Sequence, residues 1–170
     1  GFNAPSAVPS PNPRMIRYVY KTSSPDVAAP GDTVTYTVFY GKPGLANLNN
    51  IWIFDTLPAY THYVPGSGAP QAPDPGWDPD SGPPQRLQWT IANPGAPGLG
   101  QTSALTFQAT IDWGNGESFE PGSGDLAAPE GLPLTNQAQM SWDPTGCAPG
   151  RVSNAVATTV RRFLFYVLGD

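Results

Sequence analysis

Apolar and polar residues alternate along most of this chain, which is the period-two pattern of half-buried β-strands. In residues 33–40, Val34, Tyr36, Val38 and Tyr40 fall on one face, opposite three threonines and a phenylalanine. Similar patterns run through 14–21, 50–55, 86–91, 103–111, 134–142 and 152–160. An amphipathic helical pattern longer than a turn or two is missing, so the sequence predicts strands throughout.

Turn-forming residues separate these strands. The chain has 22 prolines and 19 glycines, and most of them fall between the apolar runs. Ala29–Asp32 reads as a tight reversal, and two longer segments, 65–85 and 113–133, read as long loops on a rigid scaffold. The pattern predicts an all-β sandwich of about seven to nine strands with extended terminal strands.

Composition narrows the class of protein. Hydrophobic residues make up 39% of the chain, which is enough for a core, and charged residues only 12%. A formal net charge of −5 and no long basic run argue against a nucleic-acid partner. No stretch reaches the ~20 apolar residues of a membrane helix, so we expect no membrane insertion. The low lysine content and the richness in threonine, asparagine, glycine and proline favour a secreted, extracellular or cell-surface protein.

The two ends of the sequence stand apart from the rest. The chain begins at Gly1 without an initiator methionine, so we expect a processed mature protein or a fragment. Cys147 is the only cysteine, which excludes an internal disulfide and leaves a loop thiol or a bond between chains. We expect residues 1–19 to form an N-terminal extension, residues 20–160 the sandwich, and residues 161–170 a C-terminal apolar strand.

The apolar ends are candidates for contacts between copies of the chain. The C-terminal run is apolar on both faces, so it either completes its own sheet or adds as a strand to a neighbour. The proline-rich N-terminal segment is expected to be extended and long enough to reach a neighbouring subunit, which makes it the slightly favoured donor. Heterologous, head-to-tail donation gives open filaments unless a ring closes. The interface candidates are Met15, Ile16, Tyr18, Val19, Phe163, Leu164, Phe165, Tyr166, Val167 and Leu168.

Five stretches, in order, carry a resemblance to a known family: KTSSPDVAAPGDTVTYTVFY, IWIFDTLPAYTHYVPGSG, LQWTIANPGAPGLGQTSALTFQATI, LTNQAQMSW and SNAVATTV. Over residues 20–160 this resembles the bacterial and archaeal cell-surface repeat called domain of unknown function eleven. The resemblance implies an immunoglobulin-like sandwich, and similar sandwiches build extracellular fibres joined by donated strands. The chain departs from the family's usual arrays in having one copy and additional sequence at both ends.

The resemblance also suggests a covalent crosslink. In pilin and adhesin sandwiches, a buried lysine attacks an asparagine side chain while a carboxylic acid moves the protons. The matching residues are Lys21 at the first strand, Asn136 in LTNQA and Asp55 in DTLP. Burial would lower the pKa of the lysine and raise that of the acid. The alternative places Lys21 on the surface, Asp55 as a turn cap and Asn136 on a loop backbone.

Motifs for enzymatic chemistry are weak. His62 is the only histidine, which excludes a histidine cluster for zinc, and no nucleophile motif accompanies it. Asp74, Asp78 and Asp80 match no calcium-loop spacing. We therefore predict a non-enzymatic subunit of an extracellular filament or pilus, a homopolymer without cofactor or metal. The alternative is an adhesive or carbohydrate-binding module from a larger surface protein, with loop tryptophans such as Trp77 and Trp113 stacking on sugars.

Overall fold

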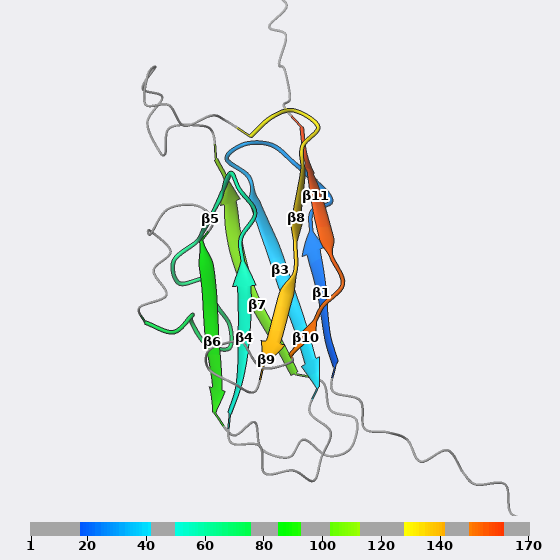
Figure 1. The fold of residues 1–170 in the computed structure, drawn as a ribbon. Coiled ribbons are helices and arrows are strands. Elements are labelled where there is room, and N and C mark those ends of the chain that lie inside the picture. The colour runs from blue at the N-terminus through cyan, green and yellow to red at the C-terminus, as the bar shows by residue number, and fades with distance from the viewer. Residues whose placement is uncertain are drawn as a thin grey trace, which may run out of the picture.

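The computed structural model describes residues 18–41, 50–75, 85–92, 103–112, 128–141 and 150–161. Across these ranges the chain forms strands and no helix, which confirms the all-β prediction (Figure 1). The strands are β1 (Tyr18–Ser24), β2 (Val27–Ala28), β3 (Thr33–Gly41), β4 (Asn50–Thr56), β5 (Thr61–Tyr63), β6 (Arg86–Ala92), β7 (Ser103–Ile111), β8 (Pro133–Asn136), β9 (Ala138–Ser141), β10 (Arg151–Val152) and β11 (Val156–Val160).

The strands build an immunoglobulin-like sandwich of two facing layers. The first layer is the sheet β1-β3-β7-β5, and the second contains the sheets β10-β9-β4-β6 and β2-β11-β8. Only Gln137 separates β8 from β9, so these two strands continue one another and join the two sheets of the second layer. The pairs are antiparallel except for β2 with β11.

The alternation predicted from the sequence places the core between the layers. In β3, the residues Val34, Tyr36, Val38 and Tyr40 are at most 5% exposed, while the threonines between them face outward. The other strands contribute in the same way, and the inward set includes Ile51, Ile53, Leu87, Trp89, Ile91, Leu105, Phe107, Ala109, Ile111, Leu134, Ala138 and Met140. Burial of apolar side chains on alternate positions is what holds the two layers together.

Turn chemistry follows the sequence at the first reversal. Asp32 N–H donates to Ala29 O at 3.0 Å, and Ala29 N–H donates back to the Asp32 carboxylate at 2.8 Å. Gly31 takes a φ of 88°, a left-handed conformation that glycine adopts without steric cost. The reversal thus connects β2 to β3 as the sequence predicts.

The first part of the predicted long loop 65–85 packs onto the sandwich. Ala69 and Thr106 exchange backbone hydrogen bonds of 2.9 and 2.8 Å, which attaches the segment to β7. Asp74 attaches it to β6, because its carboxylate accepts hydrogen bonds from the Thr90 N–H and hydroxyl and from the Gln88 amide. Asp74 is therefore a structural acceptor, whereas Asp78 and Asp80 lie outside the described residues.

The described part of the chain begins in β1 and ends directly after β11. β1 begins at Tyr18, inside the predicted extension 1–19, and Val19 pairs with Tyr40 and is only 9% exposed. Val19 is thus part of the sandwich's own core. At the other end, Arg161 N–H donates to Ala28 O at 2.8 Å, directly after β11.

Candidate functional site

Lys21 lies in the core, with its side chain fully buried between the layers. It sits on β1 opposite Val38, where the strand alternation turns it inward. Its ammonium nitrogen forms an ion pair and hydrogen bond with Asp55. The same nitrogen lies 4.4 Å from the centre of the Tyr36 ring and 5.2 Å from that of Phe107. The amine is therefore enclosed by one carboxylate and two aromatic faces.

The backbone of Lys21 is held from the other side by Asn154. Lys21 N–H donates to Asn154 Oδ1 at 2.9 Å, and Asn154 Nδ2 donates to Lys21 O at 2.9 Å. The side-chain amide of Asn154 therefore exchanges two hydrogen bonds with the Lys21 backbone, as a residue of a neighbouring strand would. Asn154 lies just before β11, so it fixes the position of Lys21 relative to the second layer.

Asp55 contacts the Lys21 ammonium from the second layer. It follows the inward residues Ile51 and Ile53 on β4 and is 1% exposed. On either side its strand partners are Leu87 and Ala138. The carboxylate therefore lies in an apolar sheet face, where an unpaired charge would be strongly unfavourable.

Asn136 completes the group. It ends β8, two positions before Ala138, and is 2% exposed. Its amide is close enough to affect the pKa values of both Asp55 and Tyr36, yet neither amide atom forms a hydrogen bond of regular geometry. The structure thus brings together Lys21, Asp55 and Asn136 from three strands and both layers.

Burial decides the protonation of this cluster. Desolvation lowers the pKa of Lys21, against the opposing pull of Asp55, and raises the pKa of Asp55, against Lys21 and Asn136. Both shifts favour the neutral amine and the neutral acid. A buried proton therefore moves from Lys21 to Asp55 more readily than it would in water.

A neutral amine beside a carboxamide and an acid is suited to one reaction. Lys21 Nζ can attack Asn136 Cγ, and the protonated Asp55 can give its proton to the leaving Nδ2 and take one from the amine. The products are an amide between the two side chains and one ammonia. No metal or cofactor enters this scheme.

The burial of all three residues excludes the exposed alternative. A surface Lys21 is wrong, because the side chain is fully buried, and neither Asp55 nor Asn136 acts as an exposed turn or loop residue. Sequence reasoning missed Tyr36 and Asn154. The sequence assigned Tyr36 only to the core face of its strand. In the structure its hydroxyl is close enough to Asp55 and Asn136 for both to affect its pKa.

The predicted subunit contacts are partly described. Tyr18, 38% exposed, lies on the outer face of β1, and Val19 is buried. Met15, Ile16 and the run Phe163–Leu168 lie outside the described residues, as does Cys147. Trp77 and Trp113, on which the adhesive alternative depends, also lie outside them.

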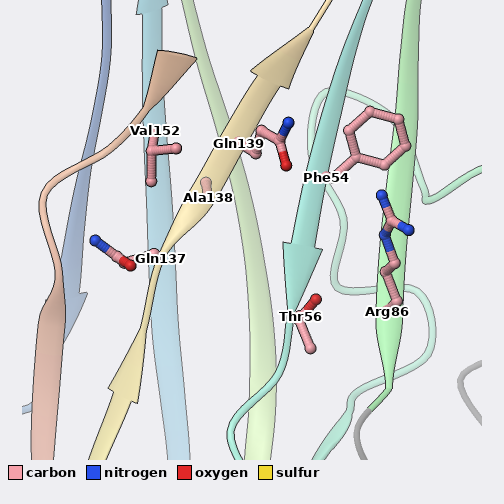
Figure 2. A pocket seen from close by; sticks show the side chains of 7 residues that line it. All are labelled: Phe54, Thr56, Arg86, Gln137, Ala138, Gln139 and Val152. Carbon is pink, nitrogen blue, oxygen red and sulfur yellow. The ribbon is translucent and has the colours of Figure 1, made fainter. Parts of the chain in front are cut away.

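An open groove of about 380 Å³ crosses the outer face of the second layer (Figure 2). It is lined by Phe54, Thr56, Arg86, Gln137, Ala138, Gln139 and Val152. The Arg86 guanidinium lies 4.6 Å from the centre of the Phe54 ring, and Phe54 is only 3% exposed. The covered ring does not offer the open aromatic face on which a sugar would stack.

His62 lies apart from the buried cluster. Its Nδ1 is 2.5 Å from Asp112 Oδ1, and the two side chains are 44% and 30% exposed. Such an accessible pair contributes little to stability. Across the described ranges, acidic, histidine and cysteine side chains do not gather in groups of three or more that could hold a metal. Nor do those ranges contain a helix long and apolar enough to span a membrane.

Comparisons with known proteins identify the fold. Neither a family model nor a curated protein matches the chain, so the resemblance to domain of unknown function eleven is not confirmed. Solved structures do match. BcpA, the major pilin subunit of Bacillus cereus, superposes with a TM-score of 0.57 at 12% identity, over 85% of this chain and 40% of that one. The full-length major pilin SpaD from Corynebacterium diphtheriae gives 0.53 at 18% identity, over 84% of this chain and 34% of that one.

The match to domains D2 and D3 of SpaD has the same TM-score of 0.53 and covers 52% of that chain. The chain thus spans only 40% of the BcpA chain and 34% of full-length SpaD. At these identities the likeness establishes a common fold, an immunoglobulin-like sandwich that major pilins also use.

Proposed function

We propose that this domain is a structural module of an extracellular pilus or surface filament, and that a self-formed amide between Lys21 and Asn136 locks its two layers together. The observation that carries the proposal is the fully buried set of Lys21, Asp55 and Asn136. Buried charged residues are rare unless they are paired or used in chemistry. The fold that the domain shares with major pilins supports the same function.

The position of the crosslink suits a module that bears tension. Force applied through the chain ends would enter at β1 and leave at β11. Lys21 lies on β1, and Asn136 pairs with Val156 on β11. A bond between Lys21 and Asn136 would pass force from the first strand to the neighbour of the last one. The residues between them would then be protected from extension.

Intact mass tests the crosslink. The wild-type chain should be lighter than its sequence mass by one ammonia, and tandem mass spectrometry should find one branched peptide joining Lys21 to Asn136. Lys21→Ala and Asn136→Ala should each restore the full sequence mass, and Lys42→Ala is the matched control that should keep the deficit. A wild-type chain at its full sequence mass would refute the crosslink.

Assembly is the second part of the proposal. We propose that copies polymerise head-to-tail by donating a terminal strand to the next subunit. Val19 is buried in the core of the domain to which it belongs, so the candidate N-terminal donor segment is residues 1–17. The alternative donor segment is residues 161–170. Negative-stain electron microscopy should show filaments with a repeat of about one domain, lost on deleting the donating end. Dispersed particles at all concentrations would refute strand donation and leave the crosslink untouched.

A further inference from the structure

Four buried polar atoms without a regular hydrogen bond belong to side chains that contact Lys21 or its partner Asp55. They are the Tyr36 hydroxyl, Asp55 Oδ1 and both amide atoms of Asn136, out of six such atoms in the described chain. Buried polar groups are almost always satisfied, so a cluster of unsatisfied ones requires an explanation. Asp55 and Asn136 affect the pKa of Tyr36, and Asn136 affects that of Asp55, so the three side chains that carry these atoms are neighbours.

The four atoms match as donors and acceptors. The Tyr36 hydroxyl and Asn136 Nδ2 are donors, whereas Asp55 Oδ1 and Asn136 Oδ1 are acceptors. Asn136 neighbours both of the other side chains. Rotation of its amide would direct Nδ2–H to Asp55 and Oδ1 to the Tyr36 hydroxyl. Such an arrangement would give each of the four atoms a partner.

We propose that Tyr36 is a catalytic residue of the crosslinking reaction, an inference that rests on the proposed function. Its hydroxyl donates a hydrogen bond to Asn136 Oδ1 and stabilises the negative charge that develops there. As the bond from Lys21 Nζ to Asn136 Cγ forms, the carbonyl electron pair moves onto Oδ1. The protonated Asp55 gives its proton to Nδ2 and takes one from the amine nitrogen. The carbonyl re-forms, the Cγ–Nδ2 bond breaks, and ammonia leaves.

The environment keeps the Tyr36 hydroxyl protonated throughout this sequence. Burial raises the pKa of Tyr36, and negative charge on Asp55 raises it further. The phenol therefore remains a hydrogen-bond donor while charge builds on the carbonyl oxygen. Its ring lies 4.4 Å from Lys21 Nζ, so one side chain contacts the nucleophile through its face and the electrophile through its hydroxyl. Donors fixed in a water-excluded site act most strongly on developing charge.

Tyr36→Phe removes the hydroxyl and keeps the ring. The full chain would be made by cell-free translation, synthesis stopped, and samples quenched in acid for intact mass over time. The loss of ammonia should slow by about 10²–10³-fold, the usual effect of removing one such donor. The matched control is Tyr40→Phe, because Tyr40 is buried on the same face of β3 and its hydroxyl is near Ser103 instead. That control should react at the wild-type rate.

Two unfavourable outcomes can be told apart. A wild-type chain that never loses ammonia refutes the proposed function itself. A wild-type chain that crosslinks, with Tyr36→Phe crosslinking equally fast, refutes only the role of Tyr36. Folding of each variant is checked by tryptophan fluorescence.

A second variant tests the role of Tyr36 if Tyr36→Phe does not fold. Placing 3-fluorotyrosine at position 36 keeps the hydroxyl and makes it a stronger donor. The rate of ammonia loss should then exceed the wild-type rate. A rate no higher than wild type in this folded variant would overturn the inference.

Discussion

Removing the crosslink should lower the stability of this domain by an amount that the structure allows us to work out. Lys21 and Asn136 are 115 positions apart in the chain. A covalent link that closes a loop of this length restricts the unfolded chain and stabilises the folded one by about 5 kcal/mol in the chain-entropy treatment of crosslinks. For a domain of this size, about 5 kcal/mol corresponds to a melting-temperature difference of ~10–20 °C.

Two variants lose the bond for different reasons. Asn136→Leu removes the electrophile and leaves the buried pair of Lys21 with Asp55. Lys21→Met removes the nucleophile, keeps most of its aliphatic volume, and leaves Asp55 without its partner. Both should melt ~10–20 °C below wild type, and Lys21→Met should melt lower still, because a buried group has lost its counter-charge.

Differential scanning calorimetry in one buffer, with intact mass on the same samples, measures this. The wild-type sample must carry the ammonia deficit and both variants must not. Melting temperatures within about 3 °C of wild type for both variants would refute the loop-closure reasoning, since that is less than about 2 kcal/mol. A large loss in Lys21→Met alone would assign the effect to the ion pair and not to the bond.

Three further predictions follow from neighbouring groups. Asn154→Ala removes both hydrogen bonds to the Lys21 backbone, so ammonia loss should slow several-fold, while Asn154→Gln, offering the same groups, should recover part of the rate in the cell-free mass assay. In Lys21→Met, where the buried Asp55 carboxyl has no counter-charge and burial raises its pKa, stability should fall as pH rises above 3.8, because the folded state keeps a proton that the unfolded state releases; adding Asp55→Asn should remove this slope in urea titrations. Asp74→Ala should cost about 1–3 kcal/mol and speed proteolysis of 64–75, and equal cleavage in wild type and variant would contradict the anchoring role.

Strand periodicity predicted most of the architecture. Val34, Tyr36, Val38 and Tyr40 were assigned to one inward face, and all are buried. This works because side chains on a strand alternate between two faces, so one apolar face marks the core. Periodicity did not show that β8 and β9 belong to different sheets, because the break at Gln137 depends on which neighbours each half pairs with.

The crosslink candidates show what could not be predicted from the sequence. Lys21, Asp55 and Asn136 were selected by resemblance, and the sequence left open whether they are buried. Their meeting point could not be read from the chain, because Lys21 and Asn136 are 115 positions apart and come from opposite layers. Contact across a sandwich depends on how the two layers are set against each other.

The sequence by itself determined where most of the strands lie, which of their faces are apolar and where the chain first reverses. These features arise from backbone geometry and side-chain burial over a few neighbouring residues. Only the tertiary structure decided that a lysine, an acid, an amide and a tyrosine hydroxyl share one dry site, and that Asn154 holds β1 in place. The reason is that desolvation and proximity come from packing of distant segments. The same residue types on an exposed face would remain ordinary solvated side chains.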